Sequence, residues 1–130
     1  AEGARRSGRD AASLRLGVVR YTAVHPDRAT AYNRVRHNLA YSAQYPYNHP
    51  LIEHAGFGSE LAAIKAAWAK NDVEAAASAI SDEMVDAMAF AGTIDDVRSR
   101  LATWSGVANF VCAPGLRYAA SGLQLLLPFP

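Results

Sequence analysis

Cysteine is nearly absent from this sequence, and so is net charge. Cys112 is the single cysteine of 130 residues, so it can form no internal disulfide and no cysteine pair for a metal. Thirteen Lys and Arg residues oppose twelve Asp and Glu residues, which leaves a formal charge of +1. Such a balance gives no broad electrostatic field that would attract nucleic acid or an anionic membrane. We expect a cytoplasmic protein without a metal, whose partner is a small-molecule substrate.

Long hydrophobic runs are also missing. No stretch reaches the roughly 18 apolar residues that span a bilayer. Residues 1–10 carry three arginines, but no apolar core of a signal peptide follows them. Hydrophobic residues nevertheless make up 51% of the chain, which suffices for the core of about one domain. We expect a soluble, single-domain protein.

Three short apolar segments predict strands. Residues 14–24 (LRLGVVRYTAV) are rich in Val, Leu, Tyr and Thr and alternate between two faces. Residues 89–112 predict a strand, a helix and a second strand, and Thr93 is placed to cap the helix. Each early strand leads directly into a helix, a pattern typical of an α/β fold with parallel strands.

The segment between these strands, residues 27–88, predicts a helical insertion. A first helix is expected over 27–44, and alanine-rich helices are expected over 59–70 and 73–80. Ser81 is a plausible N-cap of the last helix. Residues 45–57 (YPYNHPLIEHAGF) interrupt the series, and we predict a loop there because two prolines and a glycine oppose a long helix.

Several motifs in this order resemble the late region of the luciferase-like monooxygenase family. The resemblance covers most of the chain, and each motif alone is weak because alanine-rich helices and capped turns are common. The residues that carry it are Gly56-Phe57-Gly58, Trp68, Asp72, Asp82 to Met88, Ala91-Gly92-Thr93 through Leu101, Gly106 to Val111, and Gly8 through Val24.

The resemblance implies the C-terminal part of a TIM (β/α)8 barrel with an α-helical insertion. Residues 1–130 would form a single partial barrel domain, with 14–24 as the sixth strand and 89–92 and 107–112 as the seventh and eighth. The first five strands, which carry most cofactor contacts in the family, have no counterpart here. Residues 114–130 also differ from the family's long closing helix.

The resemblance further implies hydride transfer between an organic substrate and coenzyme F420, with FMN as the alternative cofactor. A different class of function is also open, namely a non-catalytic half-barrel that self-associates or pairs with a missing N-terminal part of the barrel. A stand-alone helical binding module is a third possibility. No residue is assigned a catalytic role.

Tyr21 is a candidate for the cofactor or substrate pocket. We expect it near the C-terminal end of the first strand, where barrel enzymes place active-site groups. Its phenol could hydrogen-bond a ligand oxygen. The alternative is a half-buried strand tyrosine that reaches water. Arg20 lies on the opposite face and is expected at the surface or against a helix.

Aromatic and histidine residues of 45–57 are the other candidates. Tyr47 and His49, with Tyr45 and His54, could line the mouth of a pocket, because the family's insertion often folds over the active site. Histidine could also serve as an acid or base. The alternative is a packed surface loop. The spacing of the histidines does not indicate a metal site.

Other polar groups have structural explanations. A favourable charge at the start of a helix is a better explanation than catalysis for the three acids Asp82, Glu83 and Asp86. The Gly92-Thr93 turn could approach a phosphate, but Asp95 and Asp96 would repel it, which favours a helix cap. Cys112 is expected to be a core residue, because no base is identifiable beside it.

Overall fold

The computed structural model describes residues 2–105, 108 and 110–112, and the expectations for residues 113–130 lie outside this range. Its strands are β1 (Gly17–Val19), β2 (Tyr21–Val24), β3 (Ala89–Gly92) and β4 (Phe110–Cys112). Its helices are α1 (Glu2–Arg6), α2 (Arg28–Ser42), α3 (His49–His54), α4 (Gly58–Trp68), α5 (Val73–Ser78), α6 (Asp82–Met88) and α7 (Ile94–Ala102), with 3-10 helices η1 (Ala11–Ser13) and η2 (Pro46–Asn48). The architecture is mixed α/β.

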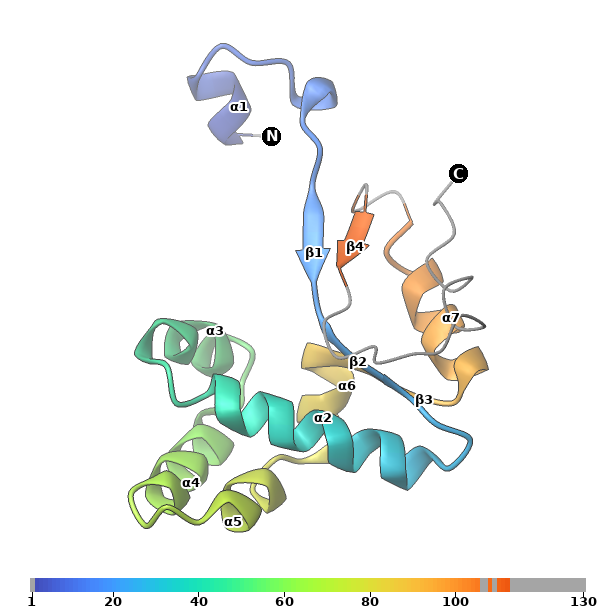
Figure 1. Cartoon of the computed structure of the whole chain (residues 1–130). Coiled ribbons are helices and arrows are strands. Elements are labelled where there is room, and N and C mark those ends of the chain that lie inside the picture. Colours follow the sequence, from blue (N-terminus) through green and yellow to red (C-terminus); the bar gives the residue numbers. More distant parts are fainter. Residues whose placement is uncertain (1, 106–107, 109, 113–130) are drawn as a thin grey trace.

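Two parallel strand pairs organise the fold. In one pair β2 lies beside β3, with Tyr21 opposite Ala89 and Val24 opposite Gly92. In the other pair β1 lies beside β4. Helix α2 packs on both β2 and β3, while α6 and α7 pack on β3 (Figure 1). Parallel pairing was predicted from the alternation of strands and helices, and it is confirmed.

The predicted strand over 14–24 is two strands with different partners. The break falls at Arg20, whose guanidinium donates to the carbonyl oxygen of Ala87 and lies 5.1 Å from the centre of the Trp104 ring. Residue 87 still belongs to α6, so β3 offers no strand partner before Ala89. The ladder with β2 therefore begins at Tyr21. Partial burial lowers the pKa of Arg20.

Strand order differs from that of three consecutive barrel strands. In a barrel the last strand would lie beside β3, because strands that follow one another in the chain are neighbours in space. Here β4 lies beside β1, and the β2–β3 pair has no third strand among the described residues. The β2–β3 pair agrees with a barrel, and the β1–β4 pair departs from it.

The prediction of a loop over 45–57 was wrong, because this segment contains η2 and α3. Pro46 and Pro50 each lie within the first two positions of a helix, where the missing amide hydrogen costs nothing. Gly56 follows α3 with φ of 92°, a conformation that glycine adopts without strain. The prolines thus start short helices here instead of preventing one.

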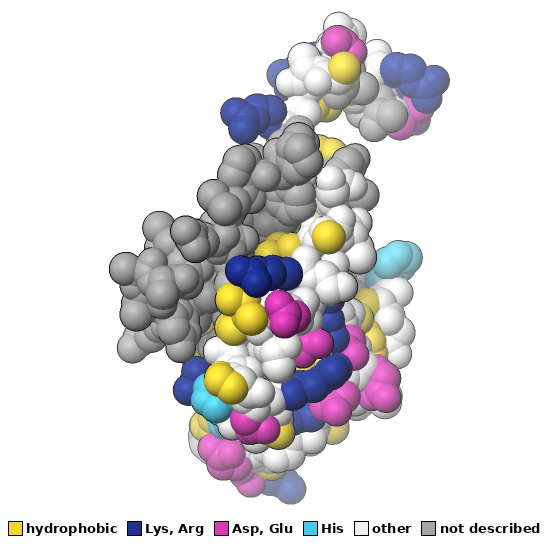
Figure 2. All heavy atoms as spheres, turned by 90° about the vertical axis from the view of Figure 1, so that its right-hand side faces the viewer, with side chains coloured by type: hydrophobic (Ala, Val, Ile, Leu, Met, Phe, Trp, Pro, Cys, Tyr) yellow, Lys and Arg dark blue, Asp and Glu magenta, His cyan; other side chains and the backbone are white. Residues whose placement is uncertain are grey.

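The helices from α2 to α6 and the β2–β3 pair share one apolar core. Ala-rich α4 and α5 pack on each other, and α5 packs on α2. The largest fully buried side chains are Ile64, Ile80, Met84, Val35, Val85, Val97 and Thr22. On the face shown in Figure 2, acidic and basic side chains are interspersed over the helical region and form no patch of one sign.

The turn from β3 into α7 is a capping box. The hydroxyl and amide of Thr93 both donate to Asp96 Oδ2, each over 2.9 Å, and the amide of Asp96 donates to Thr93 Oγ1. Backbone and side-chain bonds from Thr93 lower the pKa of Asp96. This confirms the predicted helix cap. The preceding Gly92 has φ of 136°, and a Cβ there would lie 2.6 Å from Asp96 Oδ2.

Replacing Gly92 with alanine therefore tests the turn. We expect Gly92→Ala to lower the free energy of unfolding by about 1 to 3 kcal/mol, because the backbone conformation is strained and the cap must move. Urea unfolding followed by circular dichroism measures the loss. Gly58→Ala is the matched control, since no heavy atom lies within 4 Å of its Cβ position. Equal stability of Gly92→Ala and wild type would contradict the turn geometry.

A polar cluster joins α2, α6 and α7 beside the core. Tyr32 donates its hydroxyl to Asp86, which also forms an ion pair with Arg100. Arg28 and Arg100 in turn donate to the hydroxyl oxygen of Tyr32, over 2.6 Å and 3.0 Å. The expectation that Asp86 serves as helix-start charge was thus incomplete, because its carboxylate links three helices.

Stability should depend on the charge of Asp86. Burial raises the pKa of this carboxyl, but the bonds from Tyr32 and Arg100 outweigh that effect and lower it. A lowered pKa stabilises the fold above the unfolded value of about 4, and the contribution is lost as pH falls through the folded value. The stability difference between wild type and Asp86→Asn should therefore be largest near neutral pH and shrink in acid.

Urea unfolding between neutral pH and pH 3 measures this difference. Glu83→Gln is the control, because Glu83 lies on the same helix and has no ion-pair partner among the described residues. A difference for Asp86→Asn that is independent of pH would show that the ion pair with Arg100 does not stabilise the protein.

Candidate functional site

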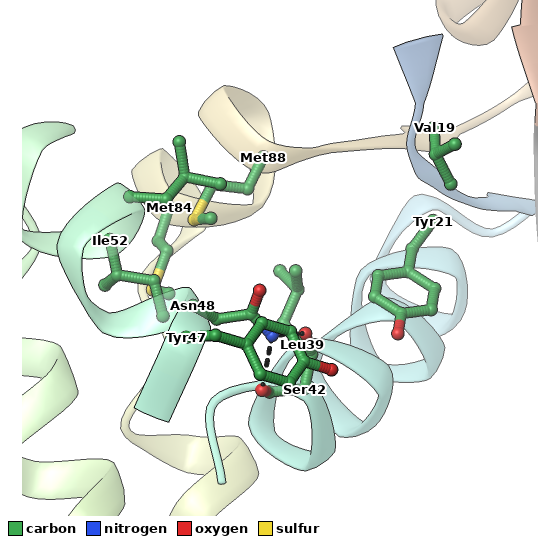
Figure 3. A pocket seen from close by; sticks show the side chains of 10 residues that line it. Val19, Tyr21, Leu39, Ser42, Tyr47, Asn48, Ile52, Met84 and Met88 are labelled. Atoms are coloured by element: carbon green, nitrogen blue, oxygen red, sulfur yellow. Dashed lines mark hydrogen bonds between the residues drawn. The ribbon is translucent and has the colours of Figure 1, made fainter. Parts of the chain in front are cut away.

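A cavity of about 370 Å³ lies at the start of β2, between the strand and the C-terminal half of α2. Apolar side chains form most of its wall (Figure 3). Leu39 comes from α2, Ile52 from α3, and Met84 and Met88 from α6. The two methionines are four residues apart, so one face of α6 presents both of them to the cavity.

Tyr21 and Tyr47 line this same cavity, although they come from β2 and η2. Figure 3 shows Val19 and Tyr21 on one side and Ile52, Met84 and Met88 on the other. The phenol of Tyr21 has no hydrogen-bond partner among the described residues. The two tyrosines that the sequence suggested as pocket residues are therefore brought together.

The position of Tyr21 differs from the one expected. Tyr21 is the first residue of β2 and pairs with Ala89, the first residue of β3. The C-terminal ends of the two strands lie at Val24 and Gly92, and beyond them the amide of His25 donates to the carbonyl oxygen of Gly92 over 3.0 Å. Because 14–24 is divided at Arg20, Tyr21 lies at the N-terminal end of a strand pair.

His49 is not among the described residues that line the cavity. Its Nε2 lies 2.9 Å from the carbonyl oxygen of Ala43, at the end of α2. A ring nitrogen that donates to this carbonyl fixes η2 and α3 against α2. The structure thus places His49 beside the wall of the cavity, in a structural contact.

Asn48 also lines the cavity, and the sequence interpretation missed it. Its amide nitrogen donates to the carbonyl oxygen and to the hydroxyl of Ser42, each over 2.9 Å. These bonds hold η2 against the C-terminal end of α2, where carbonyl groups lack helical partners. The Met84 and Met88 spacing was visible in the sequence, whereas the fold of residues 45–57 that brings Asn48 to Ser42 was not.

An aromatic cluster borders the mouth of the cavity. The rings of Tyr45 and Tyr47 are stacked, with centroids 5.5 Å apart and an interplanar angle of 22°. Tyr41 meets Tyr45 edge to face, with centroids 5.8 Å apart, and the two hydroxyls are 3.2 Å apart. Tyr47 is 75% exposed, so the ring that borders the cavity also faces solvent.

Comparison with known proteins decides the family. The sequence profile of the luciferase-like monooxygenases matches residues 1–108. The chain belongs to this family. Luciferase-like proteins have a TIM-barrel fold, and the family uses flavin or F420 cofactors in oxidoreductase chemistry. No curated protein matches the sequence.

The cavity of this luciferase-like chain suits an uncharged ring better than a phosphorylated group. Among the described residues that line it, none carries a charge, and the polar ones are Ser42, Asn48 and the two tyrosines. Both FMN and F420 carry phosphate, and burying an unpaired anion among apolar side chains is costly. The residues fit an organic substrate or the ring of a cofactor, and they do not fit a cofactor's phosphorylated tail.

Two further candidates occupy structural positions. Asp82 forms an ion pair with Arg36 on α2. Cys112 lies in β4, with its backbone opposite Val19. The described residues contain no group of three His, Cys, Asp or Glu side chains that could hold a metal ion. Nor does any described helix have the length and apolar character needed to cross a membrane.

Removal of the Asn48 amide tests the wall of the cavity. We expect Asn48→Ala to lower the free energy of unfolding by about 1 to 2 kcal/mol, because two hydrogen bonds to Ser42 are lost. Thermal unfolding measures the change. Asn38→Ala is the control, because Asn38 lies in α2 near the cavity wall and its side chain has no hydrogen-bond partner among the described residues. Equal losses in the two variants would contradict a specific role of Asn48.

Proposed function

We propose that this chain is part of an oxidoreductase in which hydride passes between coenzyme F420 and a small organic substrate held in the cavity. FMN is the alternative cofactor. The observation that carries the proposal is the family match over residues 1–108, because this range includes each described residue of the cavity wall. The cofactor supplies the hydride chemistry, and the residues of this chain position the substrate.

Within that function, Tyr21, Tyr47 and His49 have different tasks. Tyr21 offers its phenol to a substrate oxygen, and Tyr47 forms the outer wall. His49 keeps η2 and α3 in place through Ala43. The described residues present no acid–base pair at the cavity, so we assign no catalytic residue within this chain.

The same proposal places the chain in the C-terminal part of a TIM barrel. Residues 27–88 are the helical insertion, and β2 and β3 are neighbouring barrel strands. The parallel β2–β3 pair with helices between its strands supports this arrangement. It requires β4 to pair with β3 in the complete barrel, in place of the β1–β4 pair seen here.

A second candidate function is a non-catalytic half-barrel that associates with its own copies or with an N-terminal barrel part. One observation favours it. Val19 of β1 is 70% exposed, and Leu14 just before this strand is exposed as well. A second chain that covers β1 would bury these apolar side chains.

Cofactor binding separates the two candidates. The native protein is dialysed against F420 and, separately, against FMN, and the bound fraction is read from absorbance and fluorescence. We expect retention of F420, whereas retention of FMN alone would establish the alternative cofactor. If neither is retained while light scattering shows a stable oligomer, the oxidoreductase proposal is contradicted and the half-barrel is favoured.

A further inference from the structure

We infer that the cavity selects an uncharged, ring-bearing organic molecule and that Tyr47 closes over it as a movable aromatic wall. The inference deepens the proposed function. It rests on that function in one respect, namely that the bound molecule is taken to be the substrate. Binding itself requires no cofactor. It can therefore be tested independently of hydride transfer.

The composition of the wall gives the chemical class. Aliphatic and thioether side chains form most of the wall, and among them Ile52 and Met84 are buried. Thioethers adapt to the shape of a ligand and make favourable contacts with aromatic rings. The volume of about 370 Å³ lies within the range of pockets for small molecules, roughly 300 to 1,000 Å³. A flat apolar ring system is the molecule that such a wall binds best.

Two polar groups specify how that molecule is oriented. The phenol of Tyr21 has no hydrogen-bond partner among the described residues and can donate to, or accept from, a ligand. The amide nitrogen of Asn48 is already engaged with Ser42, which leaves its oxygen as an acceptor. A neutral hydroxyl on the ligand matches both groups. A carboxylate or phosphate would meet no cation at the described wall.

The contacts of Tyr47 explain why it can move. Among the described residues, its ring stacks on that of Tyr45, with centroids 5.5 Å apart, whereas Tyr45 also contacts Tyr41 through its ring and its hydroxyl. Burial does not hold Tyr47 either, because the side chain is 75% exposed. Exchange of one ring partner for another costs little, so Tyr47 can leave Tyr45 and stack on a ligand ring.

The chain carries its own probes for this test. Its two methionines are Met84 and Met88, and both line the cavity. Carbon-13 labelling of methionine methyl groups therefore gives two NMR signals, each from the cavity wall. The full chain is titrated with 2-naphthol, which is neutral at pH 7, and with 2-naphthoate, which has a similar ring and a negative charge.

We expect 2-naphthol to shift both methyl signals in a saturable manner, and 2-naphthoate to bind at least about tenfold more weakly. Tyr47→Ala should weaken 2-naphthol binding roughly threefold to tenfold, the range expected for loss of an aromatic pair. Tyr41→Ala is the matched control, because Tyr41 belongs to the same exposed cluster and does not line the cavity. It should change the affinity less than about twofold.

A charge placed at the mouth tests selectivity without disturbing the core. Leu51 lines the cavity and is 61% exposed, so Leu51→Lys should fold normally and strengthen binding of 2-naphthoate. Val73→Lys adds the same charge at an exposed position on α5, away from the cavity, and should leave that affinity unchanged. Circular dichroism verifies the fold of each variant.

The inference is overturned if 2-naphthol leaves both methyl signals in place, if 2-naphthoate binds as tightly, or if Tyr47→Ala and Tyr41→Ala behave alike. Failure of this inference can be distinguished from failure of the proposed function. Saturable binding of 2-naphthol without retention of F420 or FMN would keep the cavity and remove the oxidoreductase. Retention of a cofactor without binding of 2-naphthol would support the oxidoreductase and overturn the inference about the cavity.

Discussion

The parallel pairing of β2 with β3 is the constraint on which the rest of the described structure depends. The two strands flank the helical segment from α2 to α6, so their register fixes where this segment begins and ends. At the C-terminal end of the pair, the Thr93–Asp96 capping box turns the chain into α7. At the other end, Tyr21 begins the ladder and faces the cavity. One register thus places the helix cap at one end of the strand pair and the cavity at the other.

The cavity follows from this register because α2 runs back along the strand pair. Its C-terminal half brings Leu39 and Ser42 to the start of β2, and Asn48 then holds η2 there. Helix α6 approaches from the other side and ends where β3 begins. The wall is consequently assembled from six elements, namely β1, β2, α2, η2, α3 and α6. The cavity's described wall carries no charged side chain, so it does not fit a phosphorylated tail.

Local signals in the sequence were sufficient for much of the fold. Ser81 and Thr93 cap the helices as predicted, and β3 occupies 89–92 as expected. The pairing of residues that lie far apart in the chain was harder to predict from the sequence. Nothing within 14–24 indicates that Arg20 contacts Ala87 and divides the strand, because that contact depends on where α6 ends. The same limit affected the site: Tyr21 and Tyr47 were predicted, but the location of Tyr21 at the N-terminal end of β2 and the contribution of Asn48 arise from tertiary structure.

Backbone proton contacts between β2 and β3 test this account most directly. In a nuclear Overhauser spectrum of the labelled protein, the parallel register predicts contacts of Tyr21 with Ala89 and of Val24 with Gly92. Tyr21 would then lie at the cavity, at the opposite end of the strand pair from the capping box. Contacts of Tyr21 with Gly92 instead would establish antiparallel pairing, place the tyrosine beside Thr93, and contradict both the cavity and the fold described here.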